Sequence, residues 1–271
     1  MSLHGAGPAW LFCPADRPGR FEKAAAAADV VILDLEDGVA EPDRPAARTA
    51  LQQTPLDPAR TVVRINAAGT DDQARDLDAL AGTDYTIVML SKTESVQHVS
   101  ALAPREVVAL VETPRGAVFA REIAAAESTL AMMWGAEDLV ATLGGNSSRR
   151  SDGGYRDVAR QVRSTVLLAA SAFGRIALDA VHLDIPDLAG LEAEALDAAA
   201  VGFAATVCIH PSQIPVVRKA YRPTEEKIAW AQRLLIAAQS EPGVFAFEGQ
   251  MVDSPVFKHA ELILRRAGES S

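Results

Sequence analysis

The feature that most constrains the fold is a regular alternation of short apolar runs with longer alanine-rich stretches. Each run has the length of a strand, and the runs are too continuous for strands with one exposed face. The stretches between them, such as 20–28 and 155–174, have helical spacing, and the second ends in the glycine that commonly terminates a helix. The runs are WLFC (10–13), VVILDL (30–35), TVVRI (61–65), TIVML (86–90), VVALV (107–111), LAMMW (130–134), IALDAVHL (176–183) and ATVCI (205–209).

Strand–helix units repeated in this way predict parallel strands joined by helical crossovers. Eight such units favour a closed (β/α)8 TIM barrel of the α/β class over an open doubly wound sheet. No G-x-G-x-x-G motif follows the first run, which disfavours a dinucleotide site. The chain continues well beyond the eighth run, so we expect a barrel over residues 1–222 and a C-terminal helical extension over residues 223–271.

Composition excludes several classes of protein. Hydrophobic residues make up 49% of the 271 residues, ample for a buried core, and the formal net charge of −10 disfavours a general nucleic-acid binder. Neither a signal peptide nor an apolar run of the ~18 residues needed to cross a bilayer is present, so we expect a cytoplasmic protein without a membrane partner. The two cysteines, Cys13 and Cys208, lie in apolar runs and are expected to be buried thiols.

Charged residues follow the apolar runs at the points where a barrel enzyme carries its chemistry, the carboxyl ends of the strands. Any one of them is more often a solvent-facing or helix-capping residue, as Asp37 and Asp138 could be. Together they would converge on one rim, which predicts a functional site there. The residues are Glu36, Asp37, Arg64, Lys92, Glu112, Glu137, Asp138, Asp184 and His210.

Glu112 and Asp138 follow consecutive strands, which lie ~4.8 Å apart in a sheet, so both carboxylates can share one cation. Oxygen ligands without a His or Cys cluster indicate a hard ion, Mg2+, with Mn2+ as a substitute. Mg2+ keeps coordination positions open for a bidentate 2-oxo or hydroxy carboxylate. Arg64 could supply a fork for the same carboxylate, or form a structural salt bridge with Glu36 or Asp37.

The stretch WGAEDL (134–139) places charge directly after an apolar run. Gly135 allows the backbone to approach a ligand closely. The amides of Ala136, Glu137 and Asp138 would open a helix, and a helix N-terminus favours an anion. The stretch therefore predicts a place that favours an anion at the start of this helix.

Seven motifs, taken in order, carry a resemblance to a known family. They are LFCPADRPGRFEKA, VVILDLEDGVA, VVRIN, ALVETPRG, WGAEDL, CIHPSQIP and FEGQMVDSPV. The chain resembles the citrate lyase β-subunit-like proteins of the HpcH/HpaI aldolase and citrate lyase superfamily, and is similar to the stand-alone actinobacterial members. The resemblance covers essentially the whole chain.

The resemblance implies a (β/α)8 barrel that binds Mg2+ and cleaves or forms a carbon–carbon bond in an acyl-CoA thioester. The family's metal ligands fall on Glu112 and Asp138, and its substrate-carboxylate arginine falls on Arg64. Backbone amides at Ala136 and Glu137 are implied as further carboxylate donors. Glu36 and Asp37 match acidic positions expected to hold Arg64 and metal-bound waters in place.

The resemblance also gives the C-terminal extension a role. In the family this segment reaches a neighbouring subunit of a homotrimer, where an Asp acts in the partner's site, and the matching residue here is Asp253. The alternative is a helix N-cap before Ser254-Pro255. A helix is expected over 224–240.

Three basic residues, Arg17, Arg20 and Lys23, follow the first run and are candidates for CoA phosphates or for a solvated helix face. His210 is expected to be a hydrogen-bonded rim residue. One departure from the family is Ser91, where a proline is usual. The change frees a backbone N–H and leaves the loop after the fourth strand uncertain.

Three functions remain open from the sequence. The first is a Mg2+-dependent lyase acting on a 3-hydroxyacyl-CoA of the citramalyl, malyl or hydroxymethylglutaryl type. The second is a class II aldolase that uses free pyruvate or oxaloacetate without CoA. The third is a non-catalytic barrel that binds a 2-oxo acid.

Overall fold

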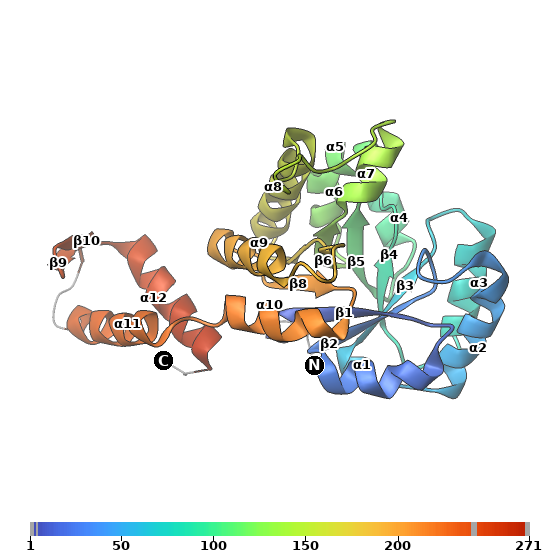
Figure 1. The fold of residues 1–271 in the computed structure, drawn as a ribbon, viewed down its shortest axis with the longest axis horizontal. Coiled ribbons are helices and arrows are strands. Elements are labelled where there is room, and N and C mark those ends of the chain that lie inside the picture. The colour runs from blue at the N-terminus through green and yellow to red at the C-terminus, as the bar shows by residue number, and fades with distance from the viewer. Residues whose placement is uncertain (1–2, 4, 240–242, 269–271) are drawn as a thin grey trace. The chain divides into compact units, whose positions relative to one another are not determined.

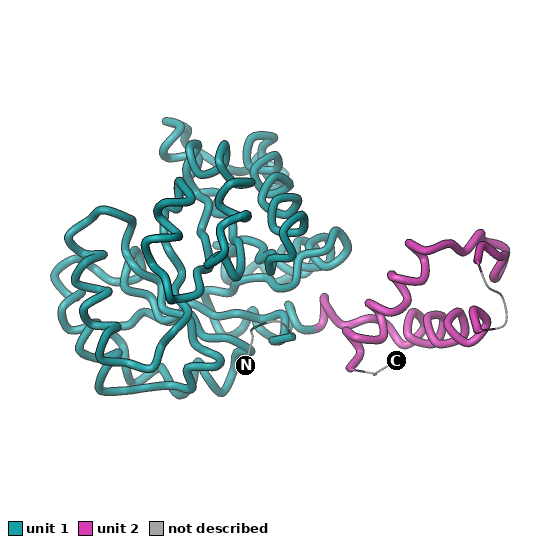
Figure 2. The backbone as a smooth tube through the Cα atoms, turned by 180° about the vertical axis from the view of Figure 1, so that it is seen from behind, with its two compact units in different colours: residues 1–218 teal, residues 219–271 magenta. Residues whose placement is uncertain are grey.

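A computed structural model describes residues 3, 5–239 and 243–268 of the chain. The chain divides into two compact units, Met1–Arg218 and Lys219–Ser271, coloured separately in Figure 2. The break lies inside a helix rather than after residue 222. A break of this kind is invisible in the sequence because the helical periodicity continues across it.

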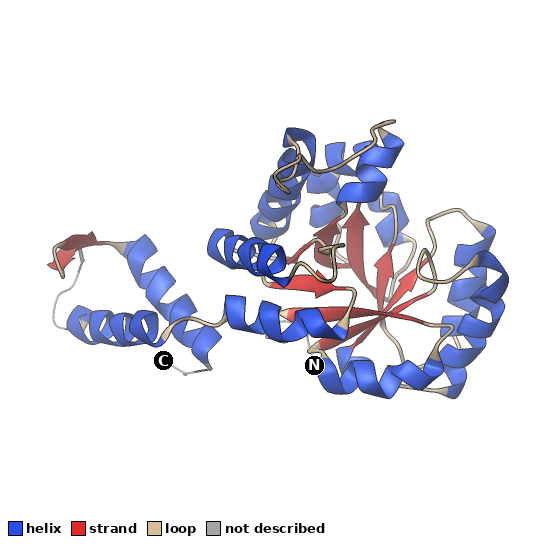
Figure 3. Cartoon of the chain, in the orientation of Figure 1, coloured by secondary structure: helices blue, strands red, loops and turns tan. Residues whose placement is uncertain are grey.

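The first unit is a closed barrel of parallel strands in which each strand pairs with the next and the eighth pairs with the first. Figure 1 shows the ring with its covering helices, and Figure 3 separates strands from helices by colour. The expected (β/α)8 fold is confirmed. The strands are β1 (Ala9–Pro14), β2 (Val30–Asp34), β3 (Thr61–Ile65), β4 (Ile87–Leu90), β5 (Glu106–Val111), β6 (Thr129–Trp134), β7 (Ile176–Asp179) and β8 (Ala205–Cys208).

Helices fill the connections between successive strands, as the alanine-rich stretches predicted. The α-helices of this part of the chain are α1 (Phe21–Ala27), α2 (Arg44–Gln53), α3 (Asp71–Leu80), α4 (Val96–Ser100), α5 (Pro114–Val118), α6 (Ala120–Ala125), α7 (Ala136–Thr142), α8 (Asp157–Ala172), α9 (Leu188–Val201) and α10 (Ile214–Tyr221). Short 3-10 turns are η1 (Pro18–Arg20), η2 (Glu41–Asp43), η3 (Pro58–Arg60) and η4 (Pro211–Gln213).

Alternation along each strand separates the barrel interior from the face that packs against helices. Val30 and Ile32 of β2, Val62 of β3, and Val108 and Leu110 of β5 belong to one continuous apolar cluster inside the barrel. The residues between them face the helices and are also buried. The next inward position on each strand therefore opens at the carboxyl rim.

The second unit contains α11 (Glu225–Ala238), a hairpin of β9 (Phe245–Phe247) and β10 (Gln250–Val252), and α12 (Ser254–Ala267). Its helices pack on each other through Ile228, Leu234 and Ile263. Thr224 caps α11 by accepting from the Lys227 N–H, so the expected helix begins where predicted. Residue 240, its expected end, lies outside the described residues.

Two expectations from composition can be compared with the structure. Cys13 and Cys208 are free and buried. Burial raises the pKa of the Cys13 thiol to about 11 and that of Cys208 to about 12. In the described part of the chain, no helix combines the length and the apolar character that crossing a membrane requires.

Candidate active site

The inward positions at the carboxyl rim are charged on three strands. Asp34 lies two residues after Ile32 on β2, Arg64 two residues after Val62 on β3, and Glu112 two residues after Leu110, directly beyond β5. Because side chains alternate along a strand, each charged group shares the face of the apolar residue that precedes it. Register places Asp34 directly beside Arg64 on the neighbouring strand. The rim therefore carries ionisable groups immediately above an apolar interior.

Arg64 is held as a planar fork by two carboxylates. Its Nε donates to Asp34 Oδ1 at 2.7 Å and its Nη2 to Asp34 Oδ2 at 2.5 Å, while Nη1 lies 3.1 Å from Glu36 Oε2. The guanidinium carbon also lies 4.6 Å from the centre of the Phe12 ring. Burial alone would lower the pKa of Arg64, but the nearby carboxylates raise it, so the group remains a cation.

The turn after β2 is built around Asp34. Its two carboxylate oxygens accept the backbone N–H groups of Glu36 and Gly38, each at 2.9 Å. A Cβ at Gly38 would lie 2.2 Å from Asp34 Oδ2, so glycine is needed at this position. The turn thereby aims Glu36 inward toward Arg64, and Glu36 is only 4% exposed. Desolvation raises the pKa of Glu36 against the lowering effect of Arg64 and Lys92.

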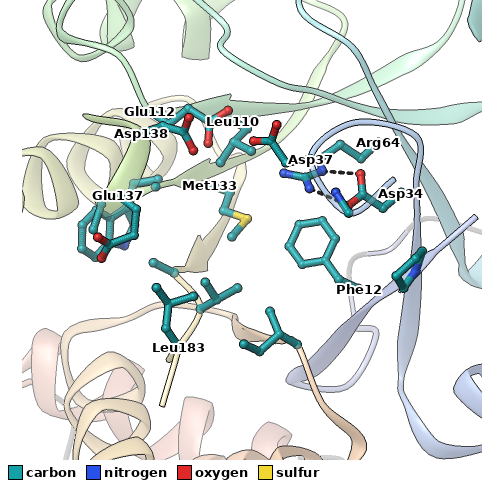
Figure 4. Close-up of a pocket in the computed structure, with 18 residues that line it drawn as sticks. Phe12, Asp34, Asp37, Arg64, Leu110, Glu112, Met133, Glu137, Asp138 and Leu183 are labelled. Atoms are coloured by element: carbon teal, nitrogen blue, oxygen red, sulfur yellow. Dashed lines mark hydrogen bonds and ion pairs between the residues drawn. The ribbon is translucent and has the colours of Figure 1, made fainter. Parts of the chain in front are cut away.

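Glu112 and Asp138 lie together on the other side of the cavity, facing Arg64 and Asp34 (Figure 4). Glu112 is 3% exposed, and burial together with the charge of Asp138 raises its pKa to about 8. A Cβ at Gly135 would lie 2.9 Å from Glu112 Oε2, so this glycine leaves space around that oxygen. The pair is thus a buried and a half-buried carboxylate with a shortage of positive charge around them.

Lys92 connects the two sides of the site. Its backbone N–H donates to Glu112 Oε1 at 2.9 Å, and its ammonium contacts Glu36 and lies 3.4 Å from Asp37 Oδ2 and 3.5 Å from Asp138 Oδ1. Burial would lower the pKa of Lys92, but the hydrogen bond and charge of Glu36, with the charges of the other carboxylates, raise it. Asp37, expected with Glu36 to hold Arg64 and metal-bound waters, lies beside this lysine and borders the cavity.

Ser91 closes the loop after β4 with contacts that proline could not make. Its N–H and its hydroxyl both donate to the Ile65 carbonyl, at 3.4 Å and 2.9 Å. The residue is fully buried. The loop is therefore fixed without the proline that is usual in the family.

A cavity of about 420 Å³, a size ordinary for a small-molecule site, is lined by charged groups that include Asp34, Arg64, Glu112 and Asp138. Phe12, Leu110 and Met133 form its apolar floor. Arg64 lies on one side and the Glu112–Asp138 pair on the other. The arrangement suits a small ligand with a carboxylate at one end and further oxygens next to the carboxylate pair.

Other candidate residues lie at the edge of this arrangement or away from it. Ala136 is buried at the start of α7, whereas the Glu137 side chain turns away from Glu112 and accepts the Ser148 hydroxyl at 2.5 Å. Arg17 is exposed, 3.8 Å from Asp16 Oδ1. His210 is an exposed residue whose Nδ1 lies 2.8 Å from the Ser212 hydroxyl, as expected of a rim residue.

Asp253 belongs to the second unit. It occupies the N-cap position of α12 with an extended backbone and Pro255 at the start of the helix, but its side chain makes no capping hydrogen bond. The carboxyl group is half-buried. Asp253 therefore occupies the N-cap position of α12, but its side chain does not cap the helix.

Two residues of the site were missed by sequence reasoning. Asp34 lies inside the run VVILDL and was read as part of the apolar core, yet it is the main partner of Arg64. Its spacing from Val30 and Ile32 was a usable signal, since the three share one face. Phe12, which stacks near Arg64, carried no signal that separated it from the core.

Comparison with known proteins places this geometry in a family. Residues 9–211 match the HpcH/HpaI aldolase/citrate lyase family. A citrate lyase subunit beta-like protein of Mycobacterium tuberculosis is 76% identical over 271 residues, which cover 100% of this chain and 99% of the relative. A mitochondrial citramalyl-CoA lyase of Homo sapiens is 31% identical over 268 residues, covering 86% of this chain and 77% of the relative.

A solved structure matches closely as well. The crystal structure of CitE from Mycobacterium tuberculosis in complex with magnesium, acetoacetate and coenzyme A superposes with a TM-score of 0.94 at 77% identity, covering 97% of this chain and 99% of that one. The fold and the extent of the match agree. The chain belongs to the HpcH/HpaI aldolase/citrate lyase family.

Proposed function

We propose that the protein is a magnesium-dependent lyase that cleaves or forms a carbon–carbon bond in a 3-hydroxyacyl-CoA thioester, giving a 2-oxo acid or related carbonyl product and an acyl-CoA. The observation that carries the proposal is the pairing, across one cavity, of two carboxylates with an arginine fork. The CitE complex with magnesium, acetoacetate and coenzyme A, and the human citramalyl-CoA lyase, support this substrate class.

The residues present fit magnesium. Glu112 and Asp138 offer only oxygens, and Mg2+ typically takes one or two protein carboxylates and completes its shell with waters and substrate. Within the described ranges no group of three or more His, Cys, Asp or Glu side chains forms a fuller metal cage, which suits such an open site. Gly135 leaves room beside Glu112 Oε2. Mn2+ is the expected substitute.

Arg64 would bind the substrate carboxylate. The guanidinium has five N–H groups; the hydrogen bonds to Asp34 engage one on Nε and one on Nη2, and Nη1 lies 3.1 Å from Glu36 Oε2. The remaining N–H groups on Nη1 and Nη2 form a fork for a carboxylate in the cavity. Asp34 and Glu36 hold the fork in place before substrate arrives, and the amides of Ala136 and Glu137 would donate to the same anion.

The reaction breaks the bond between C2 and C3 of the acyl group as the 3-hydroxyl passes its proton to water and C3 becomes the carbonyl carbon of the first product. A magnesium ion held by Glu112 and Asp138 would lower the pKa of that hydroxyl. The protein's own groups hold the carboxylate end still through Arg64, while the apolar floor of Phe12, Leu110 and Met133 excludes water. The enolate of the acyl-CoA product then needs a proton on carbon.

We infer that Asp253 of a neighbouring subunit supplies that proton in a homotrimer. The half-buried carboxyl lies beside a helix that it does not cap, so it is not committed to a structural role there. The family resemblance supports the same assignment. Residues 223–271 would then act as an extension that completes the partner's site, and Arg17 would contact CoA phosphates in a cytoplasmic enzyme.

A panel of citramalyl-, malyl- and hydroxymethylglutaryl-CoA, incubated with the full-length protein and Mg2+, tests the proposal. The expected result is a 2-oxo acid or related carbonyl compound and an acyl-CoA, identified by mass, with turnover lost in EDTA and restored by Mg2+. Turnover of free pyruvate and an aldehyde without CoA would support the aldolase instead. Binding of a 2-oxo acid without any turnover would leave a non-catalytic barrel.

A further inference from the structure

Lys92, the second residue after β4, has no role in the proposed reaction, yet its backbone is unusual. Its φ of 49° is left-handed, and among the described residues other than glycine only Glu248 shares a positive φ. Side chains with a Cβ rarely adopt this conformation. The next residue, Thr93, is tied by its N–H to the Leu110 carbonyl at 2.9 Å and by its hydroxyl to the Leu90 carbonyl at 2.7 Å. The surrounding structure therefore imposes the conformation of Lys92.

This conformation directs both ends of Lys92 at the carboxylates of the site. The backbone N–H engages Glu112 Oε1, which leaves Oε2 facing the space beside Gly135. The ammonium contacts Glu36, whose other oxygen lies 3.1 Å from Arg64 Nη1. Lys92 thus links the Glu112–Asp138 pair to Glu36, and through Glu36 to Arg64.

The charges around Lys92 explain why such a link is needed. Asp34 is matched by Arg64, but Glu36, Asp37, Glu112 and Asp138 are all close to the one ammonium. An anionic substrate would enter next to this cluster, and like charges repel strongly in a buried site. A fixed ammonium among the carboxylates reduces that repulsion. It also keeps the carboxylate side chains from moving onto the Arg64 guanidinium.

We propose that Lys92 is a positioning residue that acts through Glu36 and Glu112, keeping the carboxylates apart from the arginine fork and offsetting their charge so that a 2-oxo acid can bind beside them. The inference rests on the proposed function and adds the device that lets this acidic site accept an anion. The ammonium attracts a carboxylate and repels a divalent cation. Its removal should therefore shift the two affinities in opposite directions.

Calorimetry on the full-length protein tests this with Mg2+ alone and then with pyruvate added to the Mg2+-saturated protein. In Lys92→Met, pyruvate affinity should fall roughly tenfold or more, because the positive charge that offsets the carboxylates is lost, while Mg2+ affinity should rise about threefold. Lys92→Arg keeps the charge and should restore pyruvate affinity to within about threefold of wild type.

A glycine variant separates the ammonium from the backbone. Lys92→Gly keeps the N–H that engages Glu112 and adopts a positive φ readily. It should bind like Lys92→Met while its thermal midpoint is no lower than that of wild type. Lys227→Met, which removes an exposed lysine of α11, is the matched control and should leave both affinities unchanged.

The outcomes distinguish a failure of the positioning role of Lys92 from a failure of the proposed function. If Mg2+ and pyruvate affinities fall together in Lys92→Met, or if neither changes, the positioning role is overturned while the proposed function survives. If Lys92→Arg fails to rescue pyruvate binding although it is folded, charge is not the cause and the proposal is overturned as well. A wild-type protein that binds neither Mg2+ nor pyruvate would overturn both.

Discussion

Two arginine–aspartate pairs at strand ends of the same barrel use the same chemistry for different purposes. Asp34 ends β2 and receives Arg64 from the adjacent strand β3. Asp179 ends β7 and receives Arg163 from helix α8, with Nε 3.0 Å from Oδ1 and Nη2 2.8 Å from Oδ2. Both pairs are bidentate and largely buried. Only the first borders the cavity.

The difference comes from which side of the strand each aspartate occupies. Asp34 follows Ile32 at a spacing of two and shares its inward face, whereas Asp179 is adjacent to the inward-facing Leu178 and so points toward the helices. There it also accepts the Trp134 indole N–H at 2.6 Å. The outward pair fastens α8 to the barrel, and the inward pair prepares a fork for a ligand. A charged pair at a strand end can therefore contribute to a ligand site only when its side chains face the interior of the barrel.

The largest effect is expected from an inward carboxylate. Glu112→Gln should reduce metal-dependent turnover about a thousandfold or more, because metal stabilisation is worth several kcal/mol at a developing charge. The metal-free variant should be at least as stable as wild type, since burial and the charge of Asp138 disfavour a carboxylate at this position. Steady-state kinetics with a Mg2+ titration, and thermal melts in EDTA, check both parts. Wild-type turnover and Mg2+ affinity in this variant would remove Glu112 from the site.

The outward pair should behave in the opposite way. Arg163→Met leaves Asp179 buried without its guanidinium and should lower the free energy of unfolding by about 3 kcal/mol. Denaturant unfolding measures the loss, and KM per folded molecule should be unchanged. A large rise in KM with normal stability would mean that the outward pair also shapes the site, and the comparison would fail.

Asp253 tests whether the site extends beyond the barrel. Asp253→Asn should lower the rate of carbon–carbon cleavage roughly a hundredfold, the usual contribution of a positioned acid. Pyruvate affinity in the presence of Mg2+ should be unchanged, because the proton transfer follows binding. Mixing this variant with Glu112→Gln, each weak alone, should restore activity if the two residues act in different subunits. Unchanged cleavage kinetics would refute the acid role.

The smallest effect is expected at Arg64. Arg64→Lys keeps the charge but loses the fork, so KM should rise about tenfold with a smaller change in kcat. The free energy of unfolding should fall by less than in Arg163→Met, because the substituted ammonium can still pair with Asp34. Steady-state kinetics and denaturant unfolding measure the two effects. Equal stability losses at the two arginines would mean that the inward pair is structural as well.

The sequence predicted the barrel and much of the site. Continuous apolar runs predicted the strands because both faces of a barrel strand are buried. Arg64, Glu112 and Asp138 border one cavity as their strand positions indicated. The roles of Glu112 and Asp138 as metal ligands, and of Arg64 as the hydrogen-bond donor to a substrate carboxylate, remain predictions.

The features that the sequence did not reveal depend on contacts between side chains of different helices, strands and loops. Asp34 was overlooked because it lies among apolar residues. Its spacing of two from Ile32 could have shown that it shares the inward face of the strand. The bridging of Glu36 and Asp138 by Lys92 depends on a positive φ that no local pattern signals. The Arg163–Asp179 pair requires α8 to dock against β7, a contact between residues 16 positions apart that no local pattern marks.

The alternation of side chains along β3 has a consequence for how this protein can diversify. Inserting a single residue between Val62 and Arg64 would turn the guanidinium toward the helices and convert a ligand fork into a scaffold contact. Loops beyond the strands face no such restriction on length. New substrate preferences should therefore arise in lineages through altered loops, while the strands keep a fixed residue count.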